Sequence, residues 1–76
     1  MPWHVSISLK SKVILTVLNL VAINQIYSYD EPIEVFVSKD FEQYQLPIFD
    51  CNLAFLGDSD IKLSLSDIVQ IRFSKK

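Results

Sequence analysis

The sequence predicts a small all-β fold, an antiparallel barrel or sandwich of about six short strands, in a single domain spanning residues 1–76. Three observations predict it. Apolar and polar residues alternate along several segments with a period of two, which is the period of a β-strand. β-Branched residues are frequent in these segments, and they fit a pleated surface. Short polar breaks separate the segments, as in small barrels and sandwiches.

Length and composition narrow the class of protein. Half of the 76 residues are hydrophobic and 21% are charged, which excludes an intrinsically disordered chain. A chain this short buries only about 60% of its unfolded surface, so self-association would strengthen a marginal core. The formal charge of −2 gives no general attraction to phosphate backbones. Cys51 is the single cysteine and has no internal disulfide partner, so we expect a reducing, cytoplasmic location.

The N-terminal third contains the clearest strand and the most ambiguous segment. Along residues 3–10, Val5, Ile7 and Leu9 alternate with polar residues, and a polar break at residues 10–12 follows. Residues 13–18 are mostly β-branched or aliphatic, which favours a second strand. A helix within residues 12–27 is the alternative and would make the fold α+β. Ser11 is a candidate N-cap, but no Glu or Gln follows at the third helical position, and apolar residues would surround such a helix on all sides.

The same apolar run follows Lys10 and Lys12, the order found in a signal peptide. It contains Thr16 and Asn19, and no cleavage-type small-residue site follows it. It is also shorter than the roughly 20 apolar residues that a membrane-spanning helix needs. We therefore expect a soluble chain with no membrane partner.

The middle of the chain predicts a loop and three further alternating sets. Pro32 cannot donate to a β-ladder, which makes residues 27–32 a loop. Residues 39–42 resemble a polar turn, and Pro47 places its segment at a sheet edge or bulge. The residues expected to face the core are Ile33, Val35 and Val37, then Tyr44, Leu46 and Ile48, then Cys51, Leu53 and Phe55.

The C-terminal third predicts two strands with a short joint. Gly57 is the only glycine and opens a turn over residues 57–60, where we expect a positive φ. Ser66 and Asp67 interrupt the alternation and suit a tight joint. The residues expected to face the core are Ile61, Leu63 and Leu65, then Val69, Ile71 and Phe73.

The sequence offers no pattern typical of an enzyme. His4 is the only histidine, and no nucleophile elbow, phosphate-binding loop or paired-cysteine spacing is present. Asp58 and Asp60 resemble turn residues more than a calcium loop, which needs further acidic ligands. Cys51 is in phase with core positions and beside Asp50, which favours a buried, unreactive thiol. We therefore expect no catalysis, no cofactor and no metal.

The remaining class of function is binding to other proteins through the surface. Some large apolar residues fall out of phase with the inward sets, which favours an interface; they are Ile14, Phe36, Phe49 and Leu56. The loop combines aromatic and acidic residues, as interfaces often do. The predicted partner-binding residues are Tyr27, Tyr29, Asp30, Glu31 and Phe36. The leading interpretation is a non-enzymatic protein-binding module, a homo-oligomer of the accessory or inhibitor kind that phages and mobile elements encode.

Two alternatives stay open. A small β-barrel can bind single-stranded nucleic acid if its basic residues meet on one face. The residues that would do so are Lys10, Lys12, Arg72 and Lys75. The acidic balance disfavours nucleic acid as a partner. The third interpretation is an oligomer that binds a small metabolite between protomers.

Overall fold

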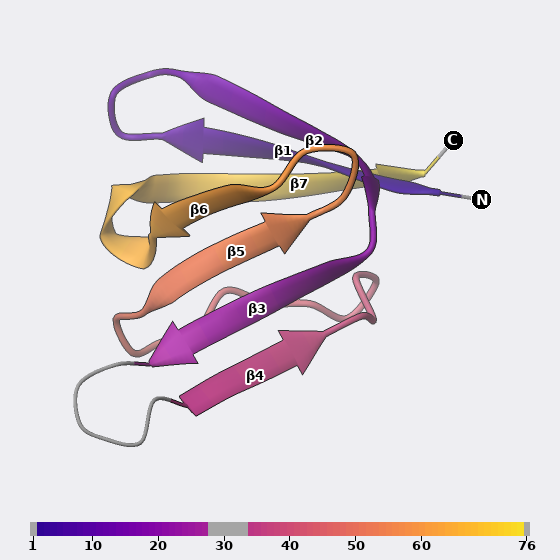
Figure 1. Ribbon diagram of the computed structural model, residues 1–76. Coiled ribbons are helices and arrows are strands. Elements are labelled where there is room, and N and C mark those ends of the chain that lie inside the picture. Colours follow the sequence, from indigo (N-terminus) through magenta and orange to yellow (C-terminus); the bar gives the residue numbers. More distant parts are fainter. Residues whose placement is uncertain (1, 28–33, 76) are drawn as a thin grey trace.

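The structure is a computed structural model that describes residues 2–27 and 34–75, and it confirms the all-β prediction. Its seven strands form two antiparallel sheets in a sandwich-like arrangement that does not close into a barrel (Figure 1). The three-stranded sheet has the order β2-β1-β7 and the four-stranded sheet the order β4-β3-β5-β6. The elements are β1 (Trp3–Leu9), β2 (Ile14–Leu20), β3 (Ala22–Tyr27), β4 (Glu34–Ser38), β5 (Asn52–Leu56), β6 (Ile61–Ser64), the 3₁₀ turn η1 (Leu65–Asp67) and β7 (Ile68–Lys75).

A tight hairpin joins β1 to β2 through residues 10–12. The Leu9 N–H donates to the Val13 carbonyl at 2.9 Å, and the Lys12 N–H donates to the Leu9 carbonyl at 2.9 Å. Lys12 has a φ of 71°. A type I turn followed by a left-handed residue gives this three-residue hairpin loop. The predicted polar break is therefore a hairpin that fixes the register of β1 against β2.

Residues 12–27, where a helix was the alternative, contain the strands β2 and β3, so the α+β alternative is wrong. Its β-branched residues pair in two different sheets, and the chain crosses between them at Val21. A bulge in β2 precedes the crossing. It is seen in the shift of the β1–β2 register between Trp3 and Val5 and in the φ of 53° at Asn19. The Val21 N–H then donates to the Leu56 carbonyl at 2.7 Å. Such bulges bend a strand and increase its twist.

The core lies between the two sheets. Most of the predicted inward residues of β1 and β5 are buried, which confirms those two alternating sets. The buried hydrophobic residues are Val5, Ile7, Val17, Leu20, Ala22, Ile23, Phe41, Cys51, Leu53, Phe55 and Ile68. At about 25 cal/mol per Å² of apolar surface, burial of these side chains is the main stabilising contribution.

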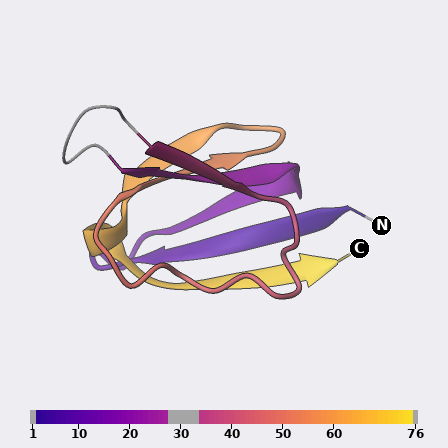
Figure 2. The ribbon, with the colours of Figure 1, turned by 90° about the horizontal axis from the view of Figure 1, so that it is seen from below.

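The segment between β4 and β5 differs from its prediction. Residues 39–51 form no strand, so the expected strand through Tyr44 and Ile48 is absent, and Ile48 is 94% exposed. Phe41, which lies in the predicted polar turn, is only 5% exposed. Figure 2 shows this segment running from the end of β4 past β7 to the start of β5. It covers a side of the sandwich that the strands leave open.

Aromatic side chains attach this segment to the other sheet. Phe41 stacks on Phe73 of β7 with ring centroids 5.7 Å apart and also contacts Trp3 edge-on at 6.2 Å. Tyr44 meets Phe73 edge-on at 5.9 Å. Aromatic pairs in these geometries contribute about 0.5–1.5 kcal/mol beyond the burial of area. Segment 39–51 is thus part of the packed structure despite its irregular backbone.

One predicted inward set, of which Ile33 lies outside the described residues, has the wrong phase, and one residue of a second set is misplaced. Val35 and Val37 are 51% and 57% exposed, because Gln25 and Ile23 of β3 pair with Phe36 and Ser38. Residues paired across a sheet lie on the same face, and a shift by one residue exchanges the faces. In β7, a bulge opposite Leu9 leaves Val69 exposed and buries Ile68 instead, whereas Ile71 and Phe73 pack against the core as predicted.

Gly57 also differs from its prediction. It has no positive φ. A Cβ atom there would lie 2.7 Å from the Leu18 carbonyl oxygen and 2.7 Å from Val17 Cγ1. Gly57 is therefore required by the close approach of the β5–β6 loop to β2. The short Ser66–Asp67 joint is confirmed as part of η1.

Candidate interaction surfaces

The outer face of β4 carries exposed aliphatic side chains on an edge strand. Val35 and Val37 are more than half exposed, and among the described residues β4 pairs only with β3. Val37 lies opposite Asn24 of β3, which lies opposite Ala54 of β5. The Asn24 Oδ1 atom is buried and has no hydrogen-bond partner within the described residues. We call Val35 and Val37 on the outer face of β4, together with the depression on the Gln25 side of the same strand, the β4 surface.

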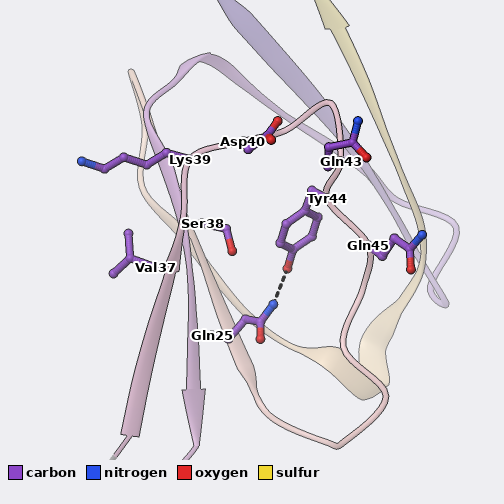
Figure 3. A pocket seen from close by; sticks show the side chains of 8 residues that line it. All are labelled: Gln25, Val37, Ser38, Lys39, Asp40, Gln43, Tyr44 and Gln45. Atoms are coloured by element: carbon purple, nitrogen blue, oxygen red, sulfur yellow. Dashed lines mark hydrogen bonds between the residues drawn. The ribbon is translucent and has the colours of Figure 1, made fainter.

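A polar depression of about 400 Å³ lies between the end of β4 and segment 39–51. In Figure 3 the Tyr44 ring stands in it, with its hydroxyl directed at Gln25. The lining is mostly amides and hydroxyls, with one positive and one negative side chain. The lining residues are Gln25, Val37, Ser38, Lys39, Asp40, Gln43, Tyr44 and Gln45. Groups of this kind hydrogen-bond to neutral polar groups such as peptide amides.

Gln25 fixes the floor of this depression through two hydrogen bonds. Its Nε2 donates to the Tyr44 hydroxyl at 3.1 Å, and its Oε1 accepts from the Tyr27 hydroxyl at 3.2 Å. Burial raises the pKa of Tyr44 above its ordinary value, and the Gln25 hydrogen bond partly opposes this. Tyr44 is thus held neutral and oriented, with the ring against Phe73 and the hydroxyl toward Gln25.

The structure describes only part of the predicted partner-binding set. Tyr27 ends β3, is half-buried against the core and donates to Gln25, so its hydroxyl has an internal role. Tyr29, Asp30 and Glu31 lie outside the described residues. Phe36 contributes backbone to β4 opposite Gln25, and its side chain also lies outside the description.

The sequence pattern does not predict that Val35 and Val37 lie on the surface. It also does not predict that Gln25 and Tyr44 line a depression. Every position from Ile33 to Val37 except Glu34 is apolar, so both phases of β4 look able to face a core. The signal that decides between them is the polar Gln25 on the neighbouring strand, and its pairing with Phe36 appears only in the register.

The predicted basic residues are not brought together. Lys10 and Lys12 lie in the β1–β2 turn, whereas Lys75 lies opposite Trp3 at the other end of β1. That length of strand is about 20 Å. The Lys75 ammonium sits 4.8 Å from the centre of the Trp3 ring, a cation–π contact. Arg72 lies between them opposite Ser6.

The side chains that could in principle serve in catalysis or metal binding make structural contacts instead. His4 Nδ1 accepts a hydrogen bond from the Asn19 N–H at 3.1 Å, which supports the β2 bulge. Cys51 is 7% exposed, and burial raises the pKa of its thiol, with Asp50 adding to this and Tyr27 opposing it. Asp58 Oδ2 accepts from Asn19 Nδ2 at 2.8 Å. Within residues 2–27 and 34–75, no three His, Cys, Asp or Glu side chains come together as metal ligands would.

Comparison with known proteins identifies no relative. No protein-family model matches the chain, and neither the curated proteins nor the solved structures contain a match. In the described part of the chain, no helix has the length and apolar character needed to cross a membrane.

Proposed function

We propose that the protein is a non-enzymatic protein-binding module that takes an extended segment of its partner at the β4 surface. The observation that carries this proposal is the pair of exposed valines, Val35 and Val37, on an edge strand. Edge strands can accept a further strand, which gains affinity from backbone hydrogen bonds and specificity from alternate side chains.

The neighbouring depression supports a peptide as the occupant. Its amide and hydroxyl groups can donate and accept, and Lys39 and Asp40 offset each other in charge. A peptide that continues past β4 would meet these groups.

The test compares tagged wild-type protein with Val37→Asp and Val69→Asp in pull-downs from the native host. Val69→Asp is the matched control for Val37→Asp, because Val37 and Val69 are 57% and 59% exposed on edge strands of different sheets. We expect the proteins retained by wild type to be retained by Val69→Asp and lost with Val37→Asp. Melting curves establish that both variants fold. Equal recovery with Val37→Asp would contradict the proposal.

A third variant addresses the aromatic, acidic segment that the sequence nominates. Tyr29→Ala is expected to weaken the recovered complex if residues 27–32 extend the contact along β4. Full recovery with Tyr29→Ala, together with loss in Val37→Asp, would confine the contact to β4 and the depression.

The two alternative functions predict different measurements. Single-stranded nucleic acid binding predicts affinity for a labelled oligonucleotide that falls steeply between about 50 and 200 mM salt. The scattered placement of Lys10, Lys12 and Lys75 does not favour it. Metabolite binding predicts a higher melting temperature with a small molecule, through mass action. Either result in place of a protein partner would contradict the proposal.

A further inference from the structure

The outer edge of β2 has unpaired backbone groups. β2 pairs with β1 alone, and the Leu9–Val13 bond sets the alternation of the ladder. Hydrogen-bonded pairs recur at every second residue in an antiparallel ladder. The backbone groups of Leu15 and Val17 therefore point toward β1, and those of Ile14 and Thr16 point outward. No backbone group in the described residues bonds to Ile14 or Thr16 from that outer side.

Along residues 13–17, before the bulge near Asn19, this edge lacks the usual protection against strand pairing. Natural edge strands carry charged residues, Pro or bulges that discourage a second chain. Residues 13–18 contain no charge, Pro or Gly. Ile14 is 65% exposed and Leu18 is 49% exposed, and Thr16 between them is exposed. The edge is closed only at Leu18, whose carbonyl accepts from the Asp58 N–H at 2.9 Å.

The charges at the two ends of β2 are opposite. Lys10 and Lys12 lie in the exposed turn that precedes β2, and Asp58 and Asp60 lie in the exposed loop that contacts its far end. Figure 1 shows β2 at the margin of its sheet, with that turn at one end and the β5–β6 loop at the other. A second copy running antiparallel along β2 places the basic turn of each copy beside the acidic loop of the other. A parallel copy would place like charges together.

We propose that β2 is a self-association edge, at which two copies of the chain pair antiparallel about a two-fold axis near Leu15. The three-stranded sheets of the two copies then form one continuous sheet. Ile14 of each copy faces Thr16 of the other, so that the unpaired N–H and C=O groups bond to each other. Leu15 faces its own counterpart on the inner side and extends the core, and the Asp58 loop limits the pairing to this register.

The proposal is independent of the β4 surface, because β2 and β4 lie in different sheets. A symmetric dimer leaves both β4 surfaces available for partners. Self-association through β2 also compensates for the small core of a short chain, since apolar surface that one copy exposes becomes buried between two.

The first test is the oligomeric state of Thr16→Lys against Gln70→Lys. Gln70 is exposed on β7, the opposite edge of the same sheet, so its variant adds the same charge away from β2. Sedimentation equilibrium of wild type at high micromolar concentration should give a dimer. Thr16→Lys brings two like charges near the axis, so we expect its dissociation constant to rise by about tenfold or more. Gln70→Lys should remain a dimer.

The second test reads the orientation of the two copies. Lys12→Glu places acidic residues together at both ends of the antiparallel contact and should weaken the dimer. Asp60→Lys in the same chain should restore it, because the exchanged charges meet again across the axis. Added salt should weaken the wild-type dimer and reduce the effect of the charge exchange.

Three outcomes would overturn the proposal. The first is a wild-type monomer at high micromolar concentration. The second is equal dimerisation of Thr16→Lys and Gln70→Lys, which would place any interface elsewhere than β2. The third is a dimer that survives Thr16→Lys but is lost in Val37→Asp, which would assign self-association to β4 and contradict the proposed function as well.

Discussion

At the scale of single residues, close contacts and register decide roles that residue type alone leaves open. Gly57 is the clearest case. Its position in a turn is evident from the sequence, but a positive φ is the wrong reason for it. The actual reason is a contact between the β5–β6 loop and the backbone of Leu18, two segments about forty residues apart. A contact between such distant segments leaves no local pattern in the sequence.

The first prediction follows from that contact. Gly57→Ala places a methyl group against the Leu18 carbonyl and Val17 Cγ1, so the loop must move away from β2. Overpacking of this kind costs about 1–3 kcal/mol. For a domain of this size, each kcal/mol lowers the melting temperature by about 4–8 °C. Ser59→Ala, an exposed change in the same loop, is the control and should leave the melting temperature within a few degrees. Equal melting temperatures for the two variants would contradict the close approach.

At the scale of elements, the predictable part of the fold is the part with local alternation. β1 and β5 follow their alternating sets, with Val5, Ile7, Leu53 and Phe55 fully buried. β4 and the start of β7 do not, because the pairing register and a bulge choose the inward face. The candidate interaction surface depends on that choice. Val35 and Val37 become surface residues through a register that the apolar segment itself does not specify.

Segment 39–51 shows why an irregular connection can be missed as part of the core. Its residues have no consistent period, and Pro47 and the polar residues around Phe41 suggest turn and edge. The structure instead uses Phe41 and Tyr44 as single anchors against Phe73. Packing of this kind depends on the partner across the gap, which is on the distant β7.

The second prediction tests this role with two phenylalanines of the same segment. Phe41→Ala removes a side chain that is 5% exposed and in contact with Trp3 and Phe73, whereas Phe49 is 74% exposed. Truncation of a buried Phe costs about 3–5 kcal/mol, so Phe41→Ala should lower the urea midpoint strongly or leave the chain unfolded. Phe49→Ala should change stability by less than about 0.5 kcal/mol. A similar midpoint for both variants would show that the segment contributes little to the core.

At the scale of the whole molecule, the open sandwich has unequal sides. One side is covered by segment 39–51, and the corner near Gly57 is closed by backbone contacts between the sheets. β7 and β6 each end one of the sheets, and β2 and β4 end them at the opposite edges, where the described residues place no neighbouring strand. The two proposals concern these two edges, one for a second copy and the other for a partner. Cys51 is buried inside the closed part and Tyr44 is half-buried beside it, so the protonation of both is coupled to folding.

The last prediction concerns the alkaline limit of this fold. Burial raises the pKa of both Tyr44 and Cys51 above their ordinary values of 10.0 and 9.0. The folded state therefore holds protons that the unfolded state releases, so stability falls as pH rises through this range. We expect the free energy of unfolding to be unaffected by these two groups at neutral pH, to decline above about pH 9 as unfolded Cys51 ionises, and to decline further above about pH 10 with Tyr44. Urea titrations from pH 7 to about pH 10.5 measure it. Cys51→Ala should remove the earlier part of the decline and Tyr44→Phe the later part, so a decline that both variants share with wild type would assign it to other groups.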